Sequence, residues 1–367
     1  MPQGYQASGD VLVNQLNDGT PLAAIWDELS EALSLYNEHR SALASLLSYS
    51  TLNAADAVAQ NVKAESFEEA SEYGVPQGIS DPSYLKLGYS IKDFDLALRM
   101  TWRYLRGADR AQVENRITRA FAADNRLVTG TILQRIFSNI VYTNDFGIPV
   151  YGLYNGDMRP PDHMGRSFAA THNHFLTTES TTLDSMDIEA GIRHISEHGY
   201  GSTQSARFLL LAHPNDVEAA KLTTWRAGVE YATSKVPRFD FVASSNAPAR
   251  LSNETVHGAV PPPEYSGLDV TGSYGRALVI ESYFIPQGWA AIVATGGPGS
   301  ESNPIGVREH SNPAYRGLRQ IPGHWHDYPL IESYLSRTFG VGVRHRGAAV
   351  AIQITNSTSY TPPIIET

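Results

Sequence analysis

Hydrophobic residues spaced three or four positions apart predict two long helices within the first 140 residues. Residues 21–47 carry one such apolar stripe, and residues 108–139 carry a longer one with the arginines off it. Asp109 is suited to cap the second helix, which would be about 45 Å long. Gly130 is a place where it could bend, and the alternative is two shorter helices broken near Asp124.

The segment that precedes the first helix is rich in glycine, at Gly4, Gly9 and Gly19, and its pattern is extended and loose. Residues 1–65 therefore consist of helical pieces joined by polar linkers. Two interpretations remain open for them. They form an arm that packs outside its own domain, or a helical layer of the same domain.

Between the two helical regions the pattern changes to short strands separated by turn formers. Strand-like runs occupy 84–87 and 89–91, after Pro76 and the Asp81-Pro82 pair. This pattern predicts a two-stranded excursion over 66–100. An isolated hairpin is marginally stable in water, so it needs a surface to lie on.

The remainder of the chain alternates helices and strands. Residues 183–198 are helical in pattern, 208–214 form a buried strand, and a further helix follows. Residues 276–295 predict two strands that meet at the turn 286–288, and 340–355 are strand-like throughout. The elements together indicate an α+β fold.

Composition narrows the class of protein. The 367 residues are 42% hydrophobic and 18% charged, which is typical of a folded chain of one elaborate domain or two. There is no apolar run of about 18 residues and no signal-peptide pattern at the N-terminus, so we expect no membrane partner. The absence of cysteine excludes disulfides and thiolate metal sites. A net charge of −10, without a lysine–arginine block, argues against a DNA-gripping surface.

Two His-x-His pairs raise the possibility of metal-dependent hydrolysis. His172 and His174 form the first pair, and His324 and His326, followed by Asp327, form the second. Such a pair on a strand directs both rings to one side, and catalytic zinc uses three protein ligands plus water. However, the chain lacks the regular strand–helix alternation of a metallohydrolase barrel. A hydrolase using these pairs stays as an alternative, and we assign no catalytic, cofactor-binding or metal residue.

Other catalytic motifs are missing. The glycine-rich run at 296–302 lacks the lysine of a phosphate-binding loop, and no G-x-S-x-G elbow is present. The features that stand out are instead a loose arm, a long hairpin and an overlong helix. Each exposes surface that a monomer would struggle to cover, as in proteins that rely on neighbouring subunits.

The C-terminal third carries a resemblance to a known family. The runs SYFIPQGWAAIVAT, NPIGVREHSNPAYRGLR and YPLIESYLSRTFGVGVRHRGAAVAIQIT look like the same region of capsid proteins from actinobacterial phages. In that family a strand, a turn at R-x-R-G-A and an apolar strand follow one another, and Arg344, Arg346, Gly347, Ala348 and Ala349 match the turn. With the order of elements, the chain resembles tailed-bacteriophage major capsid proteins of the Hong Kong 97-type fold.

The resemblance implies a division of the chain into the segments of a Hong Kong 97-like capsid fold. These are an N-terminal arm (1–65), an E-loop hairpin (66–100), a P-domain (101–184) with its spine helix (108–139), an A-domain (185–335), and the return strand of the P-domain with the C-terminal tail (336–367). It also implies that THNHF (171–175) lies in a P-domain strand. GHWHDYP (323–329) would be a loop of the A-domain or of its return to the P-domain.

The resemblance further implies contacts between subunits. On the hairpin and the terminal turn, the candidates are Tyr84, Leu85, Lys86, Leu87, Tyr89, Arg344 and Arg346. One branch of the family joins subunits by a lysine–asparagine isopeptide bond, and the only candidates here are Lys86, Lys92 and Asn356.

The implied function is that of a major capsid protein. It would self-assemble as hexamers and pentamers into an icosahedral shell that encloses double-stranded DNA without sequence-specific binding. Its expected partners are a portal protein and, where they exist, separate scaffolding and decoration proteins. No scaffolding segment precedes the arm, so a scaffold would be a separate protein or absent. It would be located in the virion, after synthesis and assembly in the bacterial host cytoplasm. An encapsulin-type shell around protein cargo is the alternative within this fold.

Overall fold

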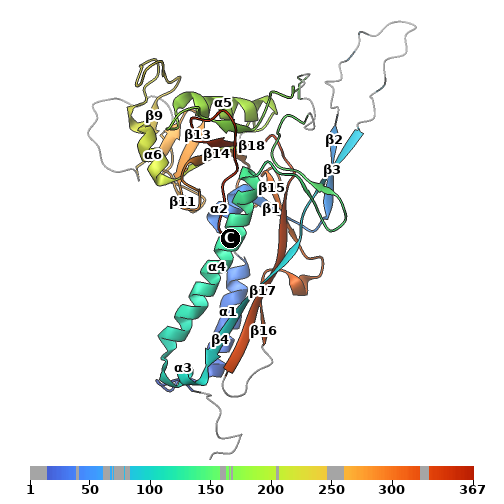
Figure 1. The fold of residues 1–367 in the computed structure, drawn as a ribbon, viewed down its shortest axis with the longest axis vertical. Coiled ribbons are helices and arrows are strands. Elements are labelled where there is room, and N and C mark those ends of the chain that lie inside the picture. Colours follow the sequence, from blue (N-terminus) through green and yellow to red (C-terminus); the bar gives the residue numbers. More distant parts are fainter. Residues whose placement is uncertain are drawn as a thin grey trace, which may run out of the picture.

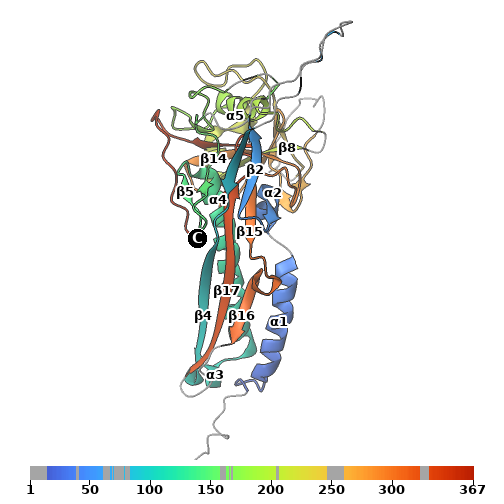
Figure 2. The ribbon, with the colours of Figure 1, turned by 90° about the vertical axis from the view of Figure 1, so that its right-hand side faces the viewer.

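The computed structural model describes residues 15–38, 41–60, 67, 69, 78, 83–157, 163–164, 166, 168–203, 206–245, 260–322 and 330–367. The molecule has an elongated half, built on one long helix and a long β-ribbon, and a rounder half built on a larger sheet (Figure 1). Figure 2 shows the helices and strands of the elongated half running side by side. Within the described ranges, no helix combines the length and the apolar character needed to cross a membrane.

The longest element is α4, Arg110–Phe137, which lies within the expected helix at 108–139. The Asp109 side chain caps it by accepting a hydrogen bond from the Gln112 N–H, at 2.9 Å. The alternative of a break near Asp124 is wrong, because α4 is continuous there. Gly130 is explained by close packing, since a Cβ at this position would lie 3.1 Å from Thr367 Cγ2.

The N-terminal helix packs on its own chain. In α1, Leu22–Glu38, the residues Leu22, Ile25, Leu29 and Leu33 are buried in one cluster with side chains of α4 and the β-ribbon. The helical-layer interpretation is therefore correct for this segment, and residues 1–14 of the expected arm lie outside the described residues. Two short helices complete this half, α2 (Ala42–Leu47) and α3 (Trp102–Gly107).

A five-stranded sheet forms the ribbon. Its central strand pairs antiparallel over ten residues with β4, from Leu330 opposite Thr101 to Phe339 opposite Lys92. The strands are β1 (Ser48–Thr51), β4 (Lys92–Thr101), β15 (Ile305–Glu309), β16 (Leu318–Pro322) and the central β17 (Leu330–Val343). Of the other three strands, β15 and β16 also pair with the central strand, and β1 pairs with β15.

A seven-stranded sheet forms the rounder half, in the order β7-β18-β14-β8-β13-β12-β9. Its strands are β7 (Phe175–Thr177), β8 (Arg207–Ala212), β9 (Phe241–Ala243), β12 (Gly272–Tyr274), β13 (Ala277–Glu281), β14 (Trp289–Thr295) and β18 (Ala349–Gln353). Two helices cover one of its faces, α5 (Ser185–Glu197) and α6 (Pro214–Ala220).

Both faces of this sheet are apolar, because each is covered. Leu209 and Leu211 point to one side, into a cluster with α2 and α4, whereas Phe208 and Leu210 point to the other, into a cluster with α5 and α6. This explains why β8 is a continuous hydrophobic run instead of an alternating one. The sheet therefore joins the two halves of the molecule through α4.

Three two-stranded sheets and two 3-10 helices lie around this framework. The first sheet is a hairpin that projects from the body, close to the upper end of the ribbon (Figure 1). The sheets are β2 (Ala55–Gln60) with β3 (Ser83–Gly88), β5 (Tyr142–Thr143) with β6 (Pro149–Val150), and β10 (Glu264–Tyr265) with β11 (Leu268–Asp269). The 3-10 helices are η1 (Leu222–Thr224) and η2 (Pro313–Tyr315).

Three features differ from the sequence pattern. The hairpin begins at β2, before the expected range 66–100, and the end of that range belongs to β4 of the ribbon. The strands β13 and β14 do not pair with each other, because β8 lies between them. The strand-like run 340–355 divides between two sheets, so that β17 ends at Val343 and β18 begins at Ala349.

Candidate functional site

The projecting hairpin is the first candidate surface. On β3 the Tyr84 side chain is 65% exposed and Lys86 is exposed, whereas Leu85 is half-buried. Leu87 and Tyr89 are buried within the chain, although they were expected at a contact between subunits. Among the described residues of β3, Tyr84 and Lys86 are therefore the side chains that remain candidates for a contact between subunits.

Tyr89 is buried because the base of the hairpin is tied to the ribbon. Its hydroxyl donates to Asp56 Oδ2 at 2.6 Å and lies 2.7 Å from the hydroxyl of Tyr49, on the neighbouring strand β1. Burial, together with the nearby Tyr49 and Asp56, raises the pKa of the Tyr89 phenol. The tyrosine therefore stays protonated and serves the subunit's own packing.

The two arginines of the R-x-R-G-A turn, Arg344 and Arg346, also differ in how deeply their side chains are buried. Arg346 is buried, and its guanidinium donates to the Gly152 carbonyl at 3.0 Å and to Asp157 Oδ1 at 3.0 Å. These bonds lie within the chain, and a contact of Arg346 with a neighbouring subunit stays a prediction. Arg344 is about one-third exposed and lies 3.7 Å from Asp56, so part of its side chain remains free for a neighbour.

The isopeptide candidates are all on the surface. Lys86 lies on the hairpin, Lys92 begins β4, and Asn356 follows β18; each side chain is exposed. A link between subunits stays a prediction for these three residues.

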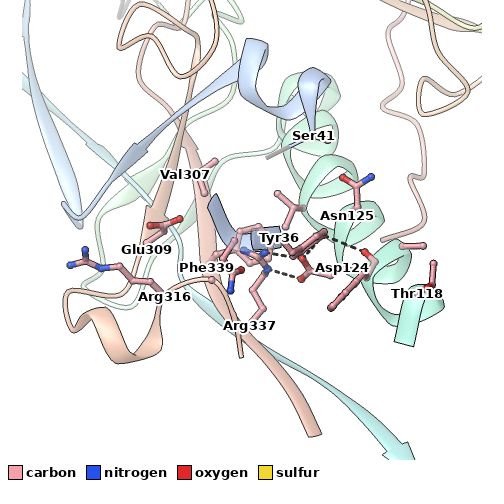
Figure 3. Close-up of a pocket in the computed structure, with 15 residues that line it drawn as sticks. Tyr36, Ser41, Thr118, Asp124, Asn125, Val307, Glu309, Arg316, Arg337 and Phe339 are labelled. Atoms are coloured by element: carbon pink, nitrogen blue, oxygen red, sulfur yellow. Dashed lines mark hydrogen bonds and ion pairs between the residues drawn. The ribbon is translucent and has the colours of Figure 1, made fainter. Parts of the chain in front are cut away.

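A groove between α1, α4 and β17 holds a buried ion pair (Figure 3). Arg337 donates from Nη2 to Asp124 Oδ2 at 2.8 Å, and the Tyr36 hydroxyl donates to the same oxygen at 2.9 Å. Burial and the Asp124 carboxylate raise the pKa of Tyr36. These bonds connect three elements that are distant in sequence, and they dock the N-terminal helix on the body.

The first His-x-His pair lies at the edge of the seven-stranded sheet, directly before β7. Its expected place in a P-domain strand stays a prediction. The structure brings a third histidine to this pair, His198 at the C-terminus of α5. His172 Nε2 lies 3.1 Å from His198 Nε2 and 3.3 Å from His174 Nε2. We call His172, His174 and His198 the histidine cluster.

The cluster is enclosed by aromatic rings and sits near one carboxylate. The ring centroid of Phe168 lies 3.8 Å from that of His198, and Tyr154 lies 5.7–6.0 Å from all three imidazoles. Glu197 Oε2 lies 3.6 Å from His172 Nδ1.

Burial lowers the pKa of every imidazole in the cluster, and that of His198 falls to about 3 because the other histidines add to the effect. All three rings are therefore neutral at neutral pH.

Sequence reasoning missed His198, although a signal was present. His194 and His198 stand four residues apart on one helix, so both face the same side of α5. The second His-x-His pair, His324 and His326, lies outside the described residues.

Comparisons with known proteins show which class of protein this chain belongs to. No family model and no curated protein matches the chain. A solved structure from Mycobacterium phage Patience is 34% identical, covers 99% of this chain and 96% of its own, and superposes with a TM-score of 0.73. The capsid of a native GTA particle is 12% identical, with a TM-score of 0.48 and coverage of 86% and 91%. The SrpI encapsulin complex of Synechococcus elongatus is 14% identical, with a TM-score of 0.44 and coverage of 87% and 89%.

The mixed fold, with its spine helix, ribbon and projecting hairpin, is the Hong Kong 97-like fold of viral shells. The 34% sequence identity to the mycobacteriophage structure, over 99% of this chain, then places the chain in one family within that fold. It belongs to the major capsid proteins of tailed bacteriophages, as the terminal R-x-R-G-A turn indicated. The hydrolase alternative finds no support in these comparisons.

Proposed function

We propose that this capsid protein assembles as pentamers and hexamers into an icosahedral shell that encloses double-stranded phage DNA. The single observation that supports it best is the match over 99% of the chain to the mycobacteriophage structure. A portal protein and separate scaffolding and decoration proteins would complete the particle. Its role would be structural, without catalysis, in a virion assembled in the host cytoplasm.

The hairpin is the surface we expect to reach a neighbouring subunit. It stands away from the body, its exposed side chains include Tyr84 and Lys86, and a lone two-stranded ribbon is marginal in water. A neighbouring subunit that covers the hairpin would bury the ring of Tyr84 and stabilise the two hairpin strands. Weak contacts of this kind, repeated over many subunits, give a durable shell.

A second exposed edge favours association as well. Among the described strands, β4 pairs only with β17, so its other edge presents backbone N–H and C=O groups over ten residues. Charged residues along it, including Lys92, Asp93 and Asp95, keep the free subunit from uncontrolled pairing. We propose that this edge lies against another part of the shell.

The electrostatic balance fits a container for DNA. The chain has 38 acidic and 28 basic residues, so its net charge opposes adhesion to phosphate backbones. DNA would then enter and leave the shell without being held by a sequence-independent basic surface. An encapsulin-type shell shares the fold, and its contents would be protein cargo instead of nuclease-protected DNA.

The test is particle formation by the full-length chain, followed by sedimentation and negative-stain microscopy. Wild-type protein should form shells or five- and six-membered rings, alone or with the phage scaffolding protein. The pair Tyr84→Ala and Lys86→Glu should reduce shell yield at least about tenfold, because side chains near the centre of an interface carry most of its energy.

The matched control is Tyr283→Ala, at a tyrosine that is 82% exposed on the connection between β13 and β14. Shells should form normally from this variant. Unimpaired assembly of the hairpin variants, with scaffold supplied, would contradict the hairpin contact. Particles purified from phage that contain stoichiometric cargo protein in place of DNA would favour the encapsulin alternative.

The isopeptide link is a separate part of the proposal. Mature particles that carry it would give cross-linked ladders on denaturing gels, and Lys86→Arg or Lys92→Arg would abolish them. Asn356→Gln, one methylene longer, tests the other partner. A single monomer band from mature wild-type particles would exclude the link.

A further inference from the structure

In the histidine cluster one imidazole nitrogen lies within hydrogen-bonding distance of two others. His172 Nε2 faces both His174 Nε2, at 3.3 Å, and His198 Nε2, at 3.1 Å. A neutral imidazole carries at most one proton on this nitrogen. When His172 Nε2 carries the proton, it can donate to the neighbouring nitrogens. When it does not, it can only accept a hydrogen bond from a neighbour that carries a proton.

The outer hydrogen bond of His174 decides its tautomer. Its Nδ1 lies 2.7 Å from the Ala349 carbonyl oxygen, which can only accept, so Nδ1 carries the proton. The lone pair of Nε2 therefore points into the cluster. Glu197, 3.6 Å from His172 Nδ1, favours the same tautomer for His172. Two lone pairs then face each other, which is unfavourable unless a cation lies between them.

A carbonyl or carboxylate on the outer nitrogen is also the usual partner of a metal-binding histidine. It fixes the ring orientation and increases the basicity of the inner nitrogen. Here Ala349 belongs to β18 and Glu197 to α5, so two separate elements orient the rings.

Two of the three distances between the ligand nitrogens fit a tetrahedral ion. A Zn–N bond of about 2.0–2.1 Å gives ligand-to-ligand distances of about 3.3–3.4 Å in a tetrahedron. The two distances from His172 Nε2 are 3.1 and 3.3 Å, and the ligand atoms of the three histidines all lie within 4.8 Å of one another. Imidazole nitrogen is a good donor for Zn²⁺ and poor for Ca²⁺ or Mg²⁺, which prefer oxygen.

The surroundings tolerate the added charge. Three arginines lie near the cluster: Arg346, whose Nη2 lies 2.9 Å from Asp157 Oδ2, Arg166, whose Nη1 lies 3.3 Å from Glu197 Oε1, and Arg193, whose charge acts on His172. Glu197 supplies a carboxylate at the edge of the cluster. Gly347 lets the terminal turn approach, because a Cβ there would lie 2.6 Å from Cγ of His198.

We propose that His172, His174 and His198 bind one divalent transition-metal ion, with Zn²⁺ as the best match, and water as the fourth ligand. The ion would tie the segment before β7 to the C-terminus of α5, and through Ala349 to the terminal strand. It goes beyond the shell function and does not depend on it, because the whole site lies within one subunit. Its role is to brace the edge of the seven-stranded sheet.

The test uses the full-length chain without a polyhistidine tag, produced with added Zn²⁺ and freed of loosely bound metal by gel filtration. Elemental analysis should give about one zinc per chain, whatever oligomer the protein forms. A strong chelator should remove it and lower the melting temperature. Wild-type protein that retains no stoichiometric Zn²⁺ or Co²⁺ under these conditions would overturn the proposal.

Variants locate the ion. His172→Asn and His198→Gln should lose the metal, whereas the control His213→Asn, at the N-cap of α6, should keep about one ion per chain because asparagine also caps helices. Glu197→Gln should weaken zinc affinity by about 10–100-fold in chelator competition, as expected for an outer-shell partner. Ligand variants that keep wild-type metal content would refute the site.

A spectroscopic readout covers the case in which the ligand variants fail to fold. Wild-type protein loaded with Co²⁺ should show the intense visible bands of a tetrahedral site with nitrogen ligands. A weak octahedral spectrum would count against the cluster. Since metal content is measured per chain, a failure to assemble into shells leaves this result readable, and loss of the metal leaves the shell function testable.

Discussion

Replacing Asp124 with asparagine should destabilise the subunit by about 3 kcal/mol, the lower end of the range for breaking a buried ion pair. The Asp124 and Arg337 side chains are only 4% and 14% exposed, so the substitution leaves a guanidinium largely away from water without its counter-charge. Asparagine keeps one oxygen for the Tyr36 hydroxyl, which limits the loss.

The assay is urea unfolding of soluble subunits at one fixed protein concentration, because association shifts apparent stability. Glu114→Gln is the matched control, since the side chains of its ion pair with Arg110 are 45–46% exposed and the pair should contribute little to stability. The double replacement of Asp124 by leucine and Arg337 by methionine should recover most of the loss, because no buried charge is then left unpaired. An Asp124→Asn variant as stable as the control would refute the reasoning.

Three further predictions concern the rounder half and the spine. Gly347→Ala should cost about 1–3 kcal/mol in thermal unfolding, because its Cβ would meet the His198 ring, whereas Gly107→Ala, with open space around it, should not destabilise. Burial, with a nearby carboxylate, raises the pKa of Asp187 from 3.8 to about 7, so its stabilisation is complete below about pH 4 and is lost as pH rises through about 7. As the pH rises from about 4 to about 7, the melting temperature of the Asp187→Asn variant should therefore fall less than that of the wild-type protein. Ile132→Ala, at a fully buried side chain of α4, should cost about 2–5 kcal/mol by urea unfolding, and a loss below about 1 kcal/mol would contradict its core position.

Long periodic elements were predicted well because their pattern is local. The spine helix was expected at 108–139 and is observed as Arg110–Phe137. The turn between the last two strands was expected at the R-x-R-G-A sequence, and β17 and β18 end and begin on either side of it. For the helix, residues within a few positions of one another determine the conformation, whereas the turn was implied by the resemblance to phage capsid proteins.

Pairing between distant strands could not be predicted in this way. The strands β13 and β14 are close in sequence and joined by a turn, yet β8 inserts between them and pairs with both. The hairpin expected over 66–100 has its first strand at Ala55–Gln60, because β3 pairs with β2 while the next strand, β4, pairs with β17. Which of several apolar strands become neighbours depends on the whole fold.

The candidate site shows the same limit. The apolar and aromatic residues Tyr84, Leu85, Leu87 and Tyr89 were all expected at a contact between subunits, but of these four only Tyr84 is strongly exposed. The fold places the base of the hairpin against the ribbon, so the burial of each side chain follows from its distance to the body. The histidine pair before β7 was evident, whereas its third member comes from a helix more than twenty residues later.

The sequence by itself determined the helical spine, the strand-rich terminal region, the acidic and cysteine-free composition, and the resemblance to phage capsid proteins. These properties are carried by local patterns and by residue identity. The tertiary structure decided which side chains face solvent, which strands pair, and which histidines converge. These depend on contacts between residues far apart in the chain, and no local pattern specifies the partner of a buried group until the chain has folded around it.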